Sequence, residues 1–261
     1  RYGIHYGWVM ATLVFIITMV SSSVSTVPQI VILPITQEFG WQISDVSNAI
    51  GVMYVVLACF APFASALMLK IGVRNVVLTA ATMNTCGLFL ITQADHEWHL
   101  LLSIGVLMGA AAGIIGVGLA ATVATRWFVR RRGLVVGILA SAFAAGQLLF
   151  VPLLAWLTTV VDWRYALVIP IIGGFFSALL FLLFSKDWPY DLRLTPLGEK
   201  EMFTPPRHDG KNAFFTSLNV LFKSANEPAF WILASTFMIC GLSSTGIVGQ
   251  HFIPFCADNN V

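Results

Sequence analysis

Polar side chains interrupt the first long apolar stretch of the chain at a spacing that could hold a small molecule. Ser22, Ser25 and Gln29 follow one another at i, i+3 and i+7, so a helix would carry them along one face. We expect Pro28 and Pro34 to interrupt this helix and to expose backbone carbonyls that suit a binding site. The alternative is that each hydroxyl bonds back to its own helix. Both interpretations stay open.

Later apolar stretches contain weaker candidates for the same kind of hydrogen-bonding site, namely Thr122, Gln147 and Ser244. The histidines and cysteines are scattered, without the spacing of a catalytic set, a zinc site or a disulfide framework. We therefore expect no catalytic residues, no metal site, no cofactor and no enzymatic activity.

A second group of residues with chemical potential is the basic segment "RWFVRRRG" (126–133), which contains Arg126, Arg130, Arg131 and Arg132. The simpler interpretation is topological, because loops rich in Lys and Arg stay on the inner side of a membrane. The second is that some of these arginines form gating ion pairs with a neighbouring loop.

Composition identifies the environment of the chain. Of its 261 residues, 58% are hydrophobic and 10% are charged, with a mean hydropathy of +0.86, whereas soluble domains contain about 25% charged residues. So much apolar surface requires a lipid bilayer as its solvent. The formal net charge of +2 is too small to indicate a nucleic-acid partner.

Seven apolar stretches reach the length of about 20 residues that a helix needs to cross a bilayer. Helices are predicted because the backbone in lipid must satisfy its hydrogen bonds within each segment. We expect an all-α membrane protein with a six-span bundle at 1–185, a linker at 186–228 and the first span of a second, incomplete bundle at 229–261. The predicted spans are 8–33, 46–68, 75–94, 99–125, 133–158, 165–185 and 229–255.

The basic residues predict the orientation of these spans. With the amino terminus placed in the cytoplasm, Arg164 is the only one of the 14 Lys and Arg residues on the outer side. We therefore expect a multi-pass protein of the cell membrane with a cytoplasmic amino terminus. No charged residue lies in the middle of a predicted span, so any charged binding site is expected beyond Val261.

Small residues recur at every fourth position in two predicted spans. The fourth span carries Gly105, Gly109 and Gly113, and the fifth carries a stripe that begins at Gly133 and Gly137 and continues through Ser141 and Ala145. Such stripes allow close helix packing. They would also allow helices to move past one another during transport.

Several segments resemble one transporter family. The run from "RWFVRRRG" to "PLLAWL" (126–157), followed by "DWRYAL" (162–167), resembles the fourth-to-sixth-span region of the monocarboxylate-porter branch of the major facilitator superfamily, which includes monocarboxylate transporters and the oxalate/formate antiporter. "LPITQEFGW" (33–41) and "DWPYDLRLTP" (187–196) are similar to the end of the family's first span and to its linker. The resemblance implies twelve spans in two bundles, a substrate in the cavity between them, and carboxylate-binding cations mainly in the second bundle.

One loop departs from the superfamily pattern Gly-x-x-x-Asp-Arg-x-Gly-x-Arg. In "SALMLKIGVR" (65–74), Ser65 replaces the first glycine and Leu69 replaces the aspartate, which places the charge relay of this motif in doubt. The basic position and the rest of the motif are kept. The gating residues that we assign to the two loops are Lys70, Gly72, Arg74, Arg126, Arg130, Arg131 and Arg132.

The leading hypothesis is a secondary active transporter that moves small organic anions by alternating access, as proton symport or anion exchange. Its partners would be a small-molecule substrate and the lipid bilayer, with an accessory or dimer partner left open. The alternatives are a major facilitator carrier of a neutral or drug-like solute and a half-length carrier that acts as a dimer. A seven-helix receptor is disfavoured because its amino terminus would lie outside the cell.

Overall fold

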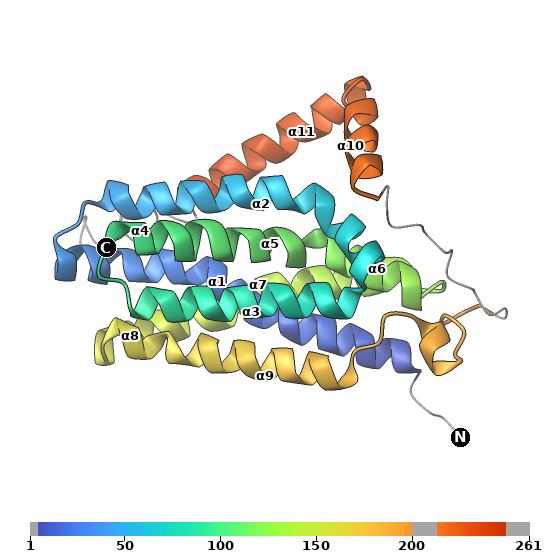
Figure 1. The fold of residues 1–261 in the computed structure, drawn as a ribbon, viewed down its shortest axis with the longest axis horizontal. Coiled ribbons are helices and arrows are strands. Elements are labelled where there is room, and N and C mark those ends of the chain that lie inside the picture. The colour runs from blue at the N-terminus through green and yellow to red at the C-terminus, as the bar shows by residue number, and fades with distance from the viewer. Residues whose placement is uncertain (1–4, 200–212, 249–261) are drawn as a thin grey trace.

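The computed structural model describes residues 5–199 and 213–248, and this part of the chain forms helices joined by short connections (Figure 1). The long helices pack side by side into one bundle. Their bounds are α1 Tyr6–Phe39, α2 Ile43–Ile71, α3 Val73–Thr92, α4 Glu97–Leu100, the π-helix η1 Leu101–Met108, α5 Gly109–Ile115, α6 Val117–Trp127, α7 Arg132–Val160, α8 Trp163–Ala166, α9 Val168–Phe184, the 3-10 helix η2 Pro189–Leu192, α10 Ala213–Ser224, α11 Pro228–Cys240 and the π-helix η3 Gly241–Val248.

Within the described residues, six helical segments are long and apolar enough to cross a membrane, and they match the first six predicted spans. The fourth is assembled from α4, η1, α5 and α6. The predicted seventh span is described as α11 and η3 up to Val248, and its last residues lie outside the described part. Both α10 and α11 lie outside the six-helix bundle, with α10 packed against α2 (Figure 1).

The first helix is continuous where the sequence predicted an interruption. Pro28 and Pro34 both lie inside α1, which is one helix from Tyr6 to Phe39. The prediction of a proline-broken helix is therefore wrong, because prolines are tolerated in membrane helices where neighbouring helices and hydroxyl side chains compensate for the lost hydrogen bond. The break lies instead in the fourth span at Gly116, whose ψ of −158° ends α5 and starts α6.

The two glycine stripes have different surroundings. A Cβ added at Gly109 would lie 2.7 Å from Met53 O, and one added at Gly113 would lie 2.7 Å from Leu57 O, so the fourth-span stripe lets α5 approach the backbone of α2. A Cβ at Gly133 or Gly137 would meet no described atom within 4 Å. The fifth-span stripe therefore lies on an open face of α7.

The buried core of the bundle consists of two apolar layers. Helix α1 contributes to both layers: its buried residues between Met10 and Ile17 belong to one, and those between Val24 and Ile35 belong to the other. Between them, Ser22 and Ser23 are fully buried. A polar zone thus crosses the middle of the bundle.

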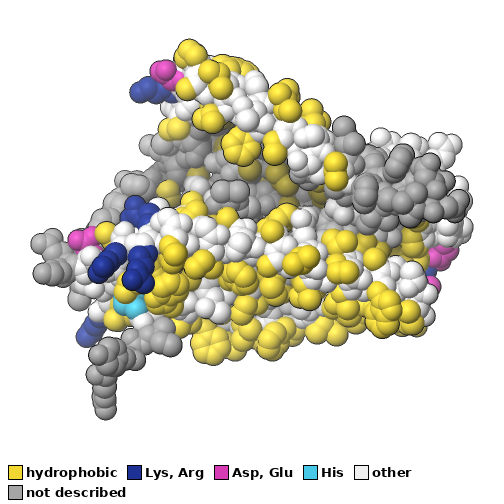
Figure 2. Space-filling model, turned by 180° about the vertical axis from the view of Figure 1, so that it is seen from behind, with side chains coloured by type: hydrophobic (Ala, Val, Ile, Leu, Met, Phe, Trp, Pro, Cys, Tyr) yellow, Lys and Arg dark blue, Asp and Glu magenta, His cyan; other side chains and the backbone are white. Residues whose placement is uncertain are grey.

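Charged side chains gather at the two ends of the bundle, and the surface between them is mostly apolar (Figure 2). We call the end with the amino terminus and residues 126–132 the basic end, and the opposite end the acidic end. At the acidic end, Arg164 Nη1 lies 2.8 Å from Glu38 Oε1, and Trp163 Nε1 donates to Glu38 Oε2 at 2.8 Å. These contacts fasten the last turn of α1 to α8.

Candidate functional site

The start of α3 at the basic end is capped by a residue from a distant part of the sequence. Asp187, which follows α9, accepts a hydrogen bond through Oδ1 from the backbone N–H of Arg74 at 2.9 Å. A carboxylate in this position satisfies a free N–H group and complements the positive end of the helix dipole. Gly72 makes this approach possible, because its φ is +87° and a Cβ there would lie 2.6 Å from Asp187 Oδ2.

Arg126 is the most buried cation at the basic end among the described residues, with 7% of its surface exposed. Its Nη2 donates to Met68 O at 3.2 Å, its Nη1 donates to Asp187 O at 3.3 Å, and its guanidinium lies 4.2 Å from the centre of the Trp188 ring. Met68 O is among the last four carbonyls of α2, which have no partner within the helix. Arg126 therefore caps α2 and joins it to α6 and to the segment after α9.

This burial differs from the sequence-based expectation. The sequence placed Arg126 in a loop, whereas α6 continues to Trp127 and carries the guanidinium inside the bundle. Arg74 behaves in a similar way, because its Nη2 donates to Leu182 O at 2.6 Å near the end of α9. Two arginines at the basic end thus satisfy carbonyls at the ends of neighbouring helices.

Residues 186–199, which we call the strap, run across the basic end instead of leaving it. Leu197 N donates to Trp127 O at 2.9 Å, and Leu197 O accepts from both Val129 N and Arg130 N at 3.1 Å. His5, which caps the start of α1, also contacts the strap, because its Nε2 lies 2.9 Å from Thr195 O. The first third of the predicted linker is therefore hydrogen-bonded to the bundle.

Beside Arg126 lies a cavity of about 430 Å³, which we call the basic cavity. Arg126 and Arg132 supply positive charge and Glu199 supplies one negative charge, whereas the Thr122 hydroxyl already donates to Gly118 O at 2.7 Å. Small-molecule sites typically measure about 300–1,000 Å³, and guanidinium groups bind carboxylates through paired N–H donors. The cavity thus has the size for a small organic anion and an excess of one positive charge in its lining. Its full lining is Ser65, Leu69, Thr122, Thr125, Arg126, Val129, Arg132, Trp188, Pro196 and Glu199.

The polar candidates in the first span do not line this cavity. Ser22 Oγ donates to Met19 O at 2.7 Å, and Gln29 Nε2 donates to Ser25 O at 3.3 Å, which is the self-bonding alternative considered from the sequence. Of the weaker candidates, Thr122 lines the basic cavity, whereas Gln147 is partly exposed on α7 and Ser244 is exposed on η3.

The seven predicted gating residues divide into three groups. Arg126 and Arg132 line the basic cavity, and Gly72 and Arg74 lie against Asp187 at the start of α3. Lys70, Arg130 and Arg131 are exposed and do not line this cavity. Sequence reasoning missed Asp187 and Trp188 as members of this site. Their only signal was an acidic and an aromatic residue directly after the sixth span, within the segment that resembles the family's linker.

We expect Asp187→Ala to destabilise the basic end by about 1 kcal/mol, the usual cost of losing a helix N-cap. Asp191→Ala is the matched control, because Asp191 accepts from Trp188 N inside the strap and does not contact α3. Thermal unfolding followed by tryptophan fluorescence would compare the two variants. Equal shifts in Tm would contradict the assignment of Asp187 as the cap of α3.

The apolar helical bundle with charge confined to its ends defines a multi-pass membrane protein. The family model of the Major Facilitator Superfamily matches residues 11–255. The chain therefore belongs to this family.

Individual relatives agree with this assignment. The chain is 27% identical to monocarboxylate transporter 11 of Mus musculus over 63% of its length and 36% of the relative's. It is 34% identical to monocarboxylate transporter 13 of Rattus norvegicus over 42% of its length and 25% of the relative's. It is also 27% identical to the uncharacterized MFS-type transporter YhjX of Escherichia coli strain K12, over 79% of its length and 48% of the relative's. The chain thus spans less than half the length of these relatives.

Proposed function

We propose that this protein is a secondary active transporter of small organic anions, and that the anion passes the basic cavity on its way across the membrane. The observation that carries the proposal is Arg126, a guanidinium that is 7% exposed and lines the cavity together with Arg132 and Thr122. A buried cation favours an anionic guest, because the guest's charge offsets the cost of keeping the guanidinium away from water. The names of the monocarboxylate transporter relatives support the same substrate class.

The topology that goes with this function follows from the charges. We infer that the basic end faces the cytoplasm, since Lys and Arg are retained on that side. We also infer that residues 1–185 form the first of two bundles, with α11 as the first helix of the second. The open stripe of α7 at Gly133 and Gly137, where no described atom would meet a Cβ within 4 Å, leaves room for a helix of that second bundle. Alternating access would then move the two bundles about the substrate, with coupling to protons or to a counter-anion.

Uptake into proteoliposomes that contain the full-length protein tests the proposal. We expect saturable uptake of small monocarboxylates or dicarboxylates and none of their uncharged amides. Arg132→Gln should weaken the apparent affinity about tenfold, because a hydrogen bond to a charged group contributes about 1.5–3 kcal/mol. Arg130→Gln, at an arginine two residues earlier that does not line the basic cavity, should leave it unchanged.

Other outcomes would point elsewhere. Equal uptake of the amides would contradict the anion assignment and favour a carrier of neutral solutes. Uptake by the 261-residue chain alone, with a dimer as the active species, would favour a half-length carrier. An imposed proton gradient or an internal anion would separate symport from exchange.

A further inference from the structure

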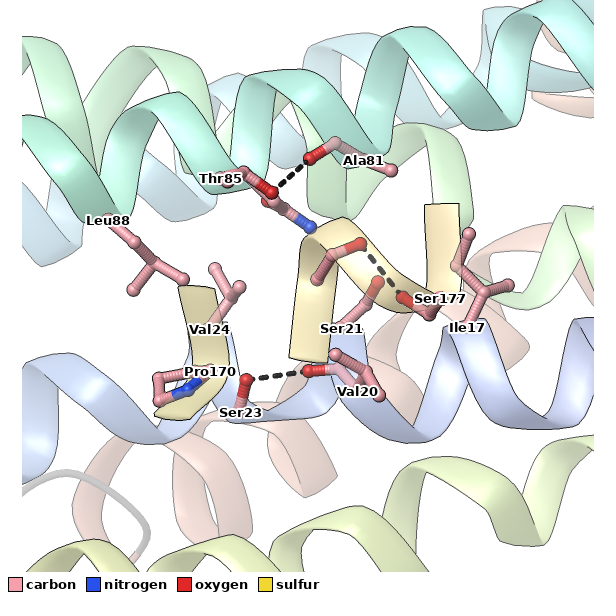
Figure 3. Close-up of a pocket in the computed structure, with 12 residues that line it drawn as sticks. Ile17, Val20, Ser21, Ser23, Val24, Ala81, Thr85, Leu88, Pro170 and Ser177 are labelled. Carbon is pink, nitrogen blue, oxygen red and sulfur yellow. Dashed lines mark hydrogen bonds between the residues drawn. The ribbon is translucent and has the colours of Figure 1, made fainter. Parts of the chain in front are cut away.

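A small cavity lies in the polar zone at the middle of the bundle, between α1, α3 and α9 (Figure 3). Its lining is mostly buried, as shown by Ile17 and Leu88, each 1% exposed. Polar groups from all three helices also face it, including Ser21 and Ser23 of α1, Asn84 and Thr85 of α3, and Ser177 of α9. The volume open to the centre of a water molecule is about 10 Å³. This is roughly the minimum for one water molecule.

Three hydroxyl groups around the cavity already donate hydrogen bonds to backbone carbonyls of their own helices. Ser23 Oγ donates to Val20 O at 2.6 Å, Thr85 Oγ1 to Ala81 O at 2.9 Å, and Ser177 Oγ to Gly174 O at 3.0 Å (Figure 3). Each of these oxygens keeps lone pairs that can accept a further hydrogen bond. The cavity wall is therefore rich in acceptors.

Unlike these hydroxyl groups, the side-chain oxygen of Asn84 forms no hydrogen bond within its own helix. Asn84 is 5% exposed, and its side-chain oxygen Oδ1 is buried without a hydrogen-bond partner among the described residues. The hydroxyl of Ser21, a residue of intermediate exposure, also has no hydrogen bond to the described part of the chain. Buried polar groups in native proteins are almost always paired, with protein or with ordered water. An unpaired amide oxygen at this depth therefore indicates a bound molecule.

We propose that the cavity holds one buried water molecule that bridges α1, α3 and α9. The water donates one hydrogen bond to Asn84 Oδ1 and a second to a hydroxyl oxygen of the wall, and it accepts from Ser21. A cation is disfavoured, because the lining has no carboxylate to balance its charge in an apolar interior. The proposal is independent of the substrate, so its failure would leave the transport hypothesis unaffected.

X-ray radiolytic labelling with mass spectrometry tests the proposal on the full-length protein, because a bound water produces hydroxyl radicals that oxidise its neighbours even where bulk water has no access. We expect Ile17 and Leu88 to be labelled several-fold faster than Ile91, which is equally buried (0% exposed) but does not line the cavity. In Asn84→Leu this excess labelling should disappear. Labelling of Ile17 and Leu88 no faster than that of Ile91 would overturn the proposal.

Thermal unfolding provides a second readout. If a water satisfies Asn84, Asn84→Leu removes its hydrogen bond and should lower Tm by about 2–4 °C. If the cavity is dry, the same change removes an unpaired amide and should raise Tm, which would contradict the proposal. Asn48→Leu at an exposed position of α2 is the control for the change of residue type. A Tm of the unsubstituted protein that depends on replacing sodium by choline would indicate a cation and also overturn the water.

Discussion

Arg126→Leu is expected to abolish anion uptake and to destabilise the basic end of the protein. The substitution leaves Met68 O and Asp187 O without their donor and removes the cation that covers the Trp188 ring. Each carbonyl that stays buried without a partner costs about 1–3 kcal/mol. Uptake should fall to background, because the basic cavity loses both its shape and its most buried positive charge.

Uptake and Tm, measured on the same preparations, separate the two roles of Arg126. Arg126→Lys keeps the charge but presents a compact ammonium that cannot reproduce the planar fork of the guanidinium. We expect this variant to recover part of the stability and little of the affinity. Arg130→Leu is the matched control, since this exposed side chain contacts neither carbonyl. Normal uptake by Arg126→Leu would show that the anion does not depend on the basic cavity.

The second large effect is expected at Gly146, where α7 crosses α1. A Cβ at this position would overlap Ser22 Oγ and Met19 O, and a backbone carbonyl cannot move aside as a flexible side chain can. Overpacking of a buried site typically costs about 1–3 kcal/mol. Gly146→Ala should therefore lie near the upper end of this range.

Gly137→Ala in the same helix is the natural comparison for Gly146→Ala. No described atom would lie within 4 Å of its Cβ, and alanine favours a helix over glycine by about 1 kcal/mol. In the 261-residue chain, Gly137→Ala should leave Tm unchanged or raise it, whereas Gly146→Ala should lower it. If Tm shifts in the same direction and by the same amount in both variants, helix propensity controls the result and the contact with α1 does not.

The sequence was sufficient to predict the elements of the fold, because lipid imposes the same rule on every span. Apolar length located the first six helices, and glycine spacing marked the face of the fourth span that packs against α2. The interruption of α1 at its prolines was a wrong prediction, since tolerance of proline depends on neighbouring helices that a single segment does not reveal. The break at Gly116 was missed for the same reason.

The candidate site was harder to predict, because its contacts join residues far apart in the chain. Arg126 looked like a loop arginine until the end of α2 and the start of the strap were placed beside it. Asp187 is more than a hundred residues from the helix that it caps. The hydroxyls of α1 had two possible partners, their own helix or a ligand, and only three-dimensional positions distinguish these options.

At the basic end, α2 and α3 are capped by residues that come later in the chain, and this order has a consequence for biosynthesis. Asp187 accepts a hydrogen bond from the first turn of α3. This residue follows the sixth span, and the ribosome therefore adds it only after all six spans have been made. Arg126, which caps α2, also follows its target in the chain. The early helices therefore enter the bilayer with incomplete ends: α6 later supplies the cap of α2, and the strap, as the last segment of the bundle to be synthesised, supplies the cap of α3.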